Sequence, residues 1–152
     1  MTGAVTGTAQ TGLTTPTYTL TADQALDNRS KQSVVTALGG TQTNVAAHSV
    51  NAPFTVTVKR PSLLRTLSSA VLNGITGQYS KVPYNEYIIL VRKGAQIAAN
   101  QWYTADFRTV LRVPAGSETY DAINLRAGLS CLFGFLSGNS SGVGDTITTG
   151  VQ

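Results

Sequence analysis

The alternation of apolar and polar residues along the chain predicts a series of β-strands. Residues 54–59 give the clearest case, because Phe, Val and Val alternate there with Thr, Thr and Lys, as in a strand with one buried face. Other segments rich in β-branched and aromatic residues predict further strands: 17–21, 33–38, 84–92 and 101–113. Glycine, proline and Asn-Gly signals separate them, and Lys93-Gly94 is predicted to turn the chain back. The pattern favours an antiparallel sheet.

Apolar residues change to helical spacing near the C-terminus. Ser117 is a candidate N-cap, and Glu118 and Asp121 lie in the first turn, where a helix favours acids. We expect one helix of about five turns that ends near Gly138, followed by a Ser/Gly/Thr-rich tail with at most one short turn. Its apolar stripe is wider than one sheet layer requires, so part of it is expected to pack on another subunit.

The chain length predicts one domain, residues 1–152. Residues 1–16, rich in Thr and Gly, are expected to form a flexible arm, residues 17–113 the sheet, and residues 117–152 the helical region. The spacing within 62–71 leaves a helix and an extended hairpin arm both open. The predicted fold is therefore α+β, an antiparallel β-sheet with helices packed on one face. Since one helix leaves half of such a sheet uncovered, dimerisation is expected.

Charge is scarce and unevenly distributed. Only 12% of the residues are charged, about half of the ~25% that is usual for soluble domains. The net charge is +4, and the segment 59–112 has eight Lys and Arg residues against two acids. This pattern indicates a polyanion partner such as RNA, DNA or an anionic surface, but a solvated basic face would give it equally well.

The sequence offers no constellation for catalysis, a metal or a cofactor. His48 is the only histidine and has no neighbouring acid in sequence, and Cys131 stands among apolar helix residues. With a single cysteine, no disulfide can form within the chain. The first seventeen residues lack the features of a signal peptide, and no apolar run is long enough to cross a bilayer. We therefore expect a soluble protein, made in the cytoplasm, with no enzymatic activity.

The order of motifs from Ala98 to Gly138 resembles the last strand and first helix of the coat proteins of single-stranded RNA bacteriophages, the leviviruses. The matching features are Ala98-Ala99, Tyr103, the Thr109 strand, Pro114, the Ser117-Glu118 cap and Ala127-Gly128-Leu129. Upstream, the Gly39-Gly40 pair, Asn44-Val45-Ala46 and the Thr-x-Thr-x-Lys strand at 55–59 are also similar. About two thirds of the chain is covered, and the order of these motifs carries the likeness.

This resemblance implies an N-terminal hairpin, a five-stranded sheet and C-terminal helices, with two subunits intertwined so that their sheets join. It also implies an icosahedral virion capsid, assembled in the bacterial cytoplasm around genomic RNA, with a maturation protein as a further partner and with RNA hairpin binding that represses translation. Carried over to this sequence, the implied RNA-binding residues are Val45, Thr55, Thr57, Lys59 and Tyr103, together with the basic Arg92.

The chain departs from that family at several positions. Ile88 and Leu90 stand where the family has a hydroxyl and a lysine, and Ala105 replaces an asparagine. Residues 61–81 look like an insertion, and the loop at 93–100 looks short. Two other functions fit the composition: a β-rich adhesion or pilus-type subunit, which would need an export signal, and a non-viral RNA-binding module, which would bind RNA without self-assembly.

Overall fold

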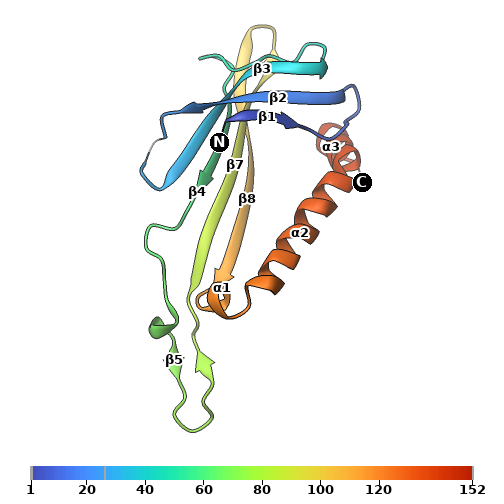
Figure 1. Cartoon of the computed structure of the whole chain (residues 1–152). Helices are drawn as coiled ribbons and strands as arrows, with labels where there is room; N and C mark the ends of the chain where they lie inside the picture. The colour runs from blue at the N-terminus through green and yellow to red at the C-terminus, as the bar shows by residue number, and fades with distance from the viewer. Residues whose placement is uncertain (1, 26, 152) are drawn as a thin grey trace.

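The computed structural model describes residues 2–25 and 27–151 and has an α+β fold, as predicted. Its main sheet has six antiparallel strands in the order β1-β2-β3-β4-β7-β8. The strands are β1 (Gly3–Thr6), β2 (Thr14–Asp23), β3 (Ser30–Thr41), β4 (Phe54–Lys59), β7 (Tyr84–Ala98) and β8 (Gln101–Pro114). Figure 1 shows β7 and β8 as a long hairpin, with β1, β2 and β3 crossing its upper end.

The N-terminal segment is more ordered than the sequence analysis predicted. Residues 1–16 were expected to be a flexible arm, but β1 pairs with β2, which itself begins at Thr14. Pro16 is fully buried. The hairpin forms because threonine and valine suit a pleated strand and because the main chain of β2 satisfies the backbone groups of β1.

The turn predicted at Lys93-Gly94 is wrong. Strand β7 continues through both residues to Ala98, because β8 pairs with it along its whole length, from Tyr84↔Pro114 to Ala98↔Gln101. The chain reverses instead at Ala99-Asn100, where Asn100 adopts a left-handed conformation with φ 61°. A tight turn therefore stands in place of the short loop expected over residues 93–100.

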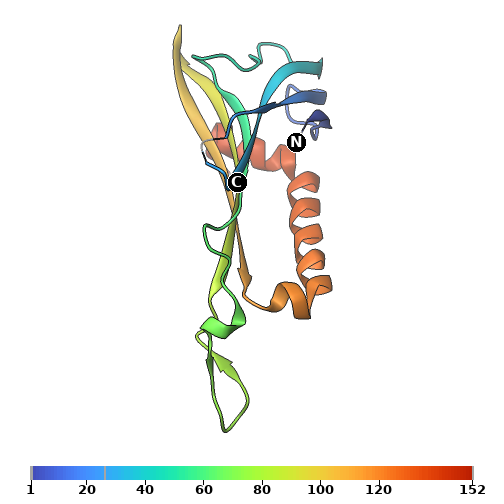
Figure 2. The same cartoon turned by 60° about the vertical axis from the view of Figure 1, so that its left-hand side comes forward.

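The insertion at 61–81 is mostly extended. It includes a 3₁₀ turn, Leu67–Ser69, and a small hairpin of β5 (Val71–Leu72) and β6 (Tyr79–Ser80). We call residues 61–83 the arm; it projects from the lower end of the sheet in both views (Figures 1 and 2). Of the two conformations left open for 62–71, the extended one is closer to the structure.

The single predicted C-terminal helix is broken near its start. α1 (Ser117–Tyr120) and α2 (Ala122–Gly138) are separated by Asp121, whose carboxylate accepts a hydrogen bond from the Asn124 backbone N–H at 3.4 Å and so caps α2. Ser117 is the first helical residue rather than the N-cap. The tail forms a third helix, α3 (Ser140–Thr149), where only one turn was expected.

The sheet has two faces of different character. Residues directly opposite each other in antiparallel strands place their side chains on the same face. Thr55, Thr57 and Lys59 oppose Arg92, Leu90 and Ile88 on β7, and we call this side the threonine face. The other side, which carries Val56, Val91 and Phe107, faces the junction of α2 and α3, and we call it the helix face.

The helices leave most of the helix face open. Neither α2 nor α3 contains a buried residue, and in both views α2 stands away from β7 and β8 (Figures 1 and 2). Within the described residues, the buried apolar side chains besides Pro16 are Val35, Ala52 and Ala115. The chain by itself therefore has a very small core for its length.

Candidate nucleic-acid interface

A small pocket on the threonine face brings together three of the six predicted RNA-binding residues. It has a volume of about 120 Å³, and its walls combine hydroxyl, aliphatic and charged side chains: Asp27, Ser30, Thr57, Lys59, Ile88, Leu90 and Arg92. Thr57, Lys59 and Arg92 are the predicted members. Hydroxyl and cationic groups beside aliphatic walls can hold a planar base and the phosphate attached to it.

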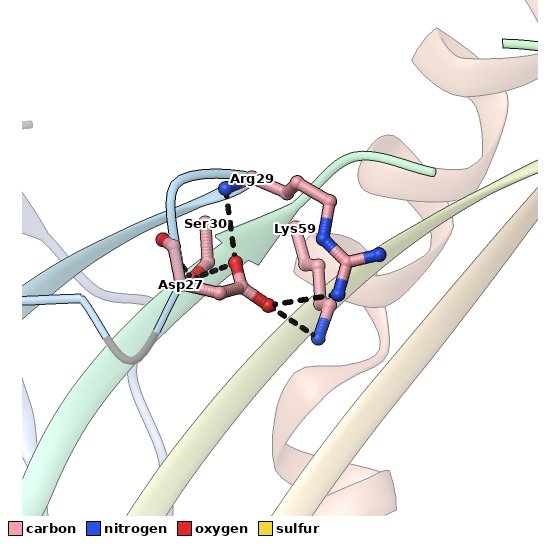
Figure 3. A network of polar contacts seen from close by, with 4 residues as sticks. All are labelled: Asp27, Arg29, Ser30 and Lys59. Atoms are coloured by element: carbon pink, nitrogen blue, oxygen red, sulfur yellow. Dashed lines mark hydrogen bonds and ion pairs between the residues drawn. The ribbon is translucent and has the colours of Figure 1, made fainter. Parts of the chain in front are cut away.

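The centre of polar contacts at this pocket is Asp27, which the sequence analysis did not select. Its Oδ2 lies 2.9 Å from Lys59 Nζ and 3.3 Å from Arg29 Nη2 (Figure 3). Its Oδ1 accepts hydrogen bonds from Ser30 Oγ at 2.9 Å and from the Arg29 backbone N–H at 3.0 Å. A carboxylate has about four acceptor positions, so these partners saturate Asp27 and it positions Lys59 instead of binding a ligand.

The pKa of Asp27 lies far below its usual range, chiefly because Lys59 donates a hydrogen bond to it and then because Ser30 does. The carboxylate therefore stays ionised at neutral pH and offsets part of the positive charge of Lys59 and Arg29. Lys59 uses one of its three N–H donors in this contact, which leaves the others for a ligand in the pocket.

Thr55 and Thr57 differ in accessibility. Thr55 is 6% exposed, so its hydroxyl is not presented to solvent. Thr57 donates a hydrogen bond to Gln32 Oε1 at 3.2 Å across the β3–β4 pair. Gln32 and Thr57 therefore form a cross-strand polar pair on the threonine face, and of the two threonines only Thr57 lines the pocket.

Tyr103 does not share a face with the other predicted residues. It opposes Ala95, whereas its neighbour Trp102 opposes Gln96. Because side chains alternate along a strand, Trp102 lies on the threonine face and Tyr103, 66% exposed, on the helix face. Tyr103 therefore does not share the threonine face with Thr57 and Lys59 in this fold, and Trp102 is the aromatic residue of β8 on that face.

Val45 precedes Ala46, whose carbonyl is bound from the opposite side of β7. The Lys93 ammonium, on the helix face, donates to the Ala46 carbonyl at 3.0 Å and to the Gly94 carbonyl at 3.1 Å, and it lies 4.9 Å from the centroid of the Phe54 ring. Partial burial lowers the pKa of Lys93. Lys93 is thus a structural cation, and the described contacts do not bring Val45 to the pocket.

The sequence could not reveal the ion-pair network, since Asp27 and Lys59 are far apart along the chain. The sequence analysis named Ile88 and Leu90 only as departures from the coat-protein family, at positions where the family has a hydroxyl and a lysine, and not as walls of a pocket. Among the described residues, no group of three or more His, Cys, Asp or Glu side chains could hold a metal ion. Likewise, no described helix has the length and apolarity needed to cross a membrane.

Comparison with solved structures shows to which family of proteins the chain is similar. The chain is similar to a structure described as the virus-like particle of bacteriophage ESE020, with 47% sequence identity and a TM-score of 0.93. The alignment covers 100% of this chain and 98% of that chain. No protein-family model matches the chain, and no curated protein matches it.

Proposed function

Because this chain belongs to the coat proteins of bacteriophages, we propose that it is a capsid subunit that dimerises, closes into an icosahedral shell and encloses single-stranded RNA. The shell-forming role rests on the 47% identity, over the whole chain, to a protein that forms a virus-like particle. This likeness favours the coat-protein interpretation over an adhesion subunit or a non-viral RNA-binding module. The proposed function includes no chemical step and no cofactor.

Dimerisation is supported by one observation above all: α2 has seventeen residues and buries none of them in its own chain. Apolar side chains occur around most of its circumference, and several are strongly exposed: Ile123 at 79%, Phe133 at 48% and Phe135 at 60%. A helix that is apolar on nearly all sides is normally buried on nearly all sides. A second copy of the chain, with its own α2 and uncovered helix face, has the matching surface.

The second open surface is the outer edge of β8, the last strand of the sheet. An edge strand of fourteen residues has a row of backbone N–H and C=O groups available for pairing. Pairing of two β8 strands would join two sheets into one and extend the threonine face across the dimer. The same surface would then carry the pockets of both subunits.

RNA binding is supported by the charge of the threonine face, which carries Lys59, Arg92, Arg108 and Arg112. The pocket with Thr57, Lys59 and Arg92 is the proposed contact for an unpaired base of an RNA hairpin, through which the subunit would repress translation. A maturation protein is the proposed further partner in a virion assembled in the bacterial cytoplasm.

The test is to express the full chain in a bacterium and examine it by light scattering and negative-stain microscopy. We expect closed particles of uniform size that contain nuclease-protected RNA. A monodisperse monomer at high concentration would refute both dimerisation and shell formation. Particles without protected RNA would leave the coat function intact and refute the RNA part of the proposal.

A further inference from the structure

A larger, strongly basic groove lies where the arm leaves the sheet. It has a volume of about 800 Å³ and is next to the small pocket, with which it shares Lys59 and Ile88. Five cationic side chains and a single carboxylate, that of Glu86, line it. We call it the arginine groove, and its cationic residues are Arg29, Lys59, Arg60, Arg65 and Arg112.

Hydrogen bonds fix the backbone of Arg60 and Arg65 at this groove. The Arg60 backbone N–H donates to the Arg29 carbonyl at 3.1 Å, which ties the start of the arm to the β2–β3 connection. The Asn85 side chain, 1% exposed, accepts from the Arg65 backbone N–H at 2.8 Å and donates to the Arg65 carbonyl at 3.0 Å. A buried amide that binds both backbone groups of one residue fixes that residue against β7, so the groove is part of the fold.

The positive charges of the groove are only partly balanced within the chain. Arg29 and Lys59 share Asp27, and Arg112 pairs with Glu86 at 3.1 Å. In the part of the chain that the structure describes, Arg60 and Arg65 have no acidic partner within ion-pair distance. Cations held close together repel one another, and a polyanion that spans them would relieve this repulsion.

The groove also contains an aromatic ring that is open to solvent. Tyr84 is 45% exposed, and the Arg112 guanidinium carbon lies 4.9 Å from the centroid of its ring. A ring combined with a guanidinium group in a basic groove is the arrangement that proteins use to stack an unpaired base while neighbouring cations bind phosphates. A duplex, whose bases are already stacked on one another, could not use Tyr84 in this way.

We infer that the arginine groove binds the backbone of a single-stranded RNA segment, with phosphates on Arg60 and Arg65 and one unpaired base stacked on Tyr84. This site adjoins the pocket around Thr57, with which it shares Lys59 and Ile88, and it extends to Arg65 of the arm. The inference rests on the proposed packaging of RNA, and it assigns to the arm a part in binding that RNA. Each subunit would then hold packaged RNA at a second point, without regard to base sequence.

The first test measures how salt affects binding of a short single-stranded oligoadenylate to full-length subunits. Log K for RNA binding falls as log salt rises, and each lost phosphate contact makes this negative slope shallower by about 0.7 for single strands. The slope of the double variant Arg60→Gln, Arg65→Gln should therefore be shallower than the wild-type slope by about 1.4. The double Lys variant, which keeps both charges, and Lys81→Gln, a cation of the arm outside the groove, should keep the wild-type slope.

An unchanged slope in the double Gln variant would overturn the groove as an RNA site. If the variant failed to assemble but bound oligoadenylate as tightly as the wild type, the groove would instead be a contact between copies, and the inference would also be overturned. Wild-type particles that contain no RNA would refute the RNA part of the proposed function, on which this inference rests. RNA-filled wild-type particles with an unchanged variant slope would refute the groove alone.

The second test needs no variant. Ultraviolet cross-linking of RNA-filled wild-type particles, followed by peptide mass spectrometry, should give an RNA adduct on the peptide that contains Tyr84. Adducts confined to the peptides that carry Thr57 or Trp102 would overturn the stacking role of Tyr84.

Discussion

Gly94 is the residue whose replacement should affect the sheet most directly. It is buried in β7, its N–H donates to the Pro53 carbonyl at 2.6 Å, and a β-carbon there would lie 2.6 Å from the α-carbon of Ala52. Gly94→Ala should lower the free energy of unfolding by about 1–3 kcal/mol, the usual cost of overpacking. Urea denaturation would measure it.

Gly74, in the turn of the arm, provides the control for Gly94. A β-carbon at Gly74 would meet nothing within 4 Å, so Gly74→Ala should leave the urea midpoint nearly unchanged. Equal midpoints for Gly94→Ala and the wild type would show that the loop before β4 does not pack on β7 as described.

Asp27 should make stability depend on acid pH. Its pKa is lowered in the folded state, mainly by Lys59, whereas an unfolded aspartate titrates near about 3.9. Above that value both states are ionised and the full stabilisation is present; as the pH falls below it, the unfolded state binds the proton first and stabilisation is lost. Asp27→Asn should therefore be less stable than the wild type at neutral pH, with a difference that shrinks below about pH 4.

Urea midpoints measured from neutral pH to below about pH 4 would show how the stability of the wild type and of Asp27→Asn depends on pH. Asp145→Asn is the matched control, because Asp145 is exposed on α3 and forms no ion pair with another described residue. Parallel curves for Asp27→Asn and the wild type would contradict the role of the ion-pair network.

The residues of the site show what a sequence can and cannot indicate. Thr57 and Lys59 were assigned to the site through the resemblance to phage coat proteins; the alternation with valines predicted only that both lie on one face of a strand, because strand period is a local property. Asp27 could not be identified from the sequence, because only the pairing of β3 with β4 brings it to Lys59. The face on which Tyr103 lies could not be predicted, since it depends on the register between β7 and β8, and a shift of one residue reverses it.

Among the secondary-structure elements, those with a strong local pattern were predicted best. β4 has the bounds that its alternation indicates, residues 54–59. β7 is longer than predicted because pairing with β8 overrides the turn preference of Lys93-Gly94. The helix break at Asp121 was missed because an acid in the first turn and an acid at an N-cap have the same sequence signature.

Helix α2 is the element on which the proposed dimer depends most. Phe133 is 48% exposed in the single subunit, and in the proposed dimer it would be buried. Phe133→Ser should weaken the dimer by about 3 kcal/mol, which is a loss of roughly a hundredfold in affinity. Sedimentation or light scattering over a dilution series would measure this.

Ile75→Ser is the control for the helix variant. Ile75, in the turn of the arm, is 98% exposed, so the same apolar-to-polar change should leave the dimer intact. An undiminished dimer in Phe133→Ser would show that this side of α2 is not part of the interface.

A single chain leaves much of its apolar surface and the backbone groups of an edge strand exposed to solvent. Its described residues bury only Val35, two alanines and Pro16 among apolar side chains, which is far too little to offset the conformational entropy of a folded domain of this length. In the proposed dimer, a second copy would cover the helix face, α2 and the β8 edge and so supply the burial that the single chain lacks. Folding and association should then be one process.

This coupling makes the stability of unassembled subunits depend on their concentration. Since two unfolded chains combine into one folded dimer, dilution favours the unfolded state by mass action, and the urea midpoint should fall steadily as the subunit concentration is lowered. Circular dichroism at several concentrations, in buffer without RNA, would show the shift. Phe133→Ser should have a lower urea midpoint than the wild type at every concentration, and the midpoints of Ile75→Ser should match those of the wild type. A midpoint independent of concentration would mean that the single chain folds alone, and the open helix would then need a different explanation.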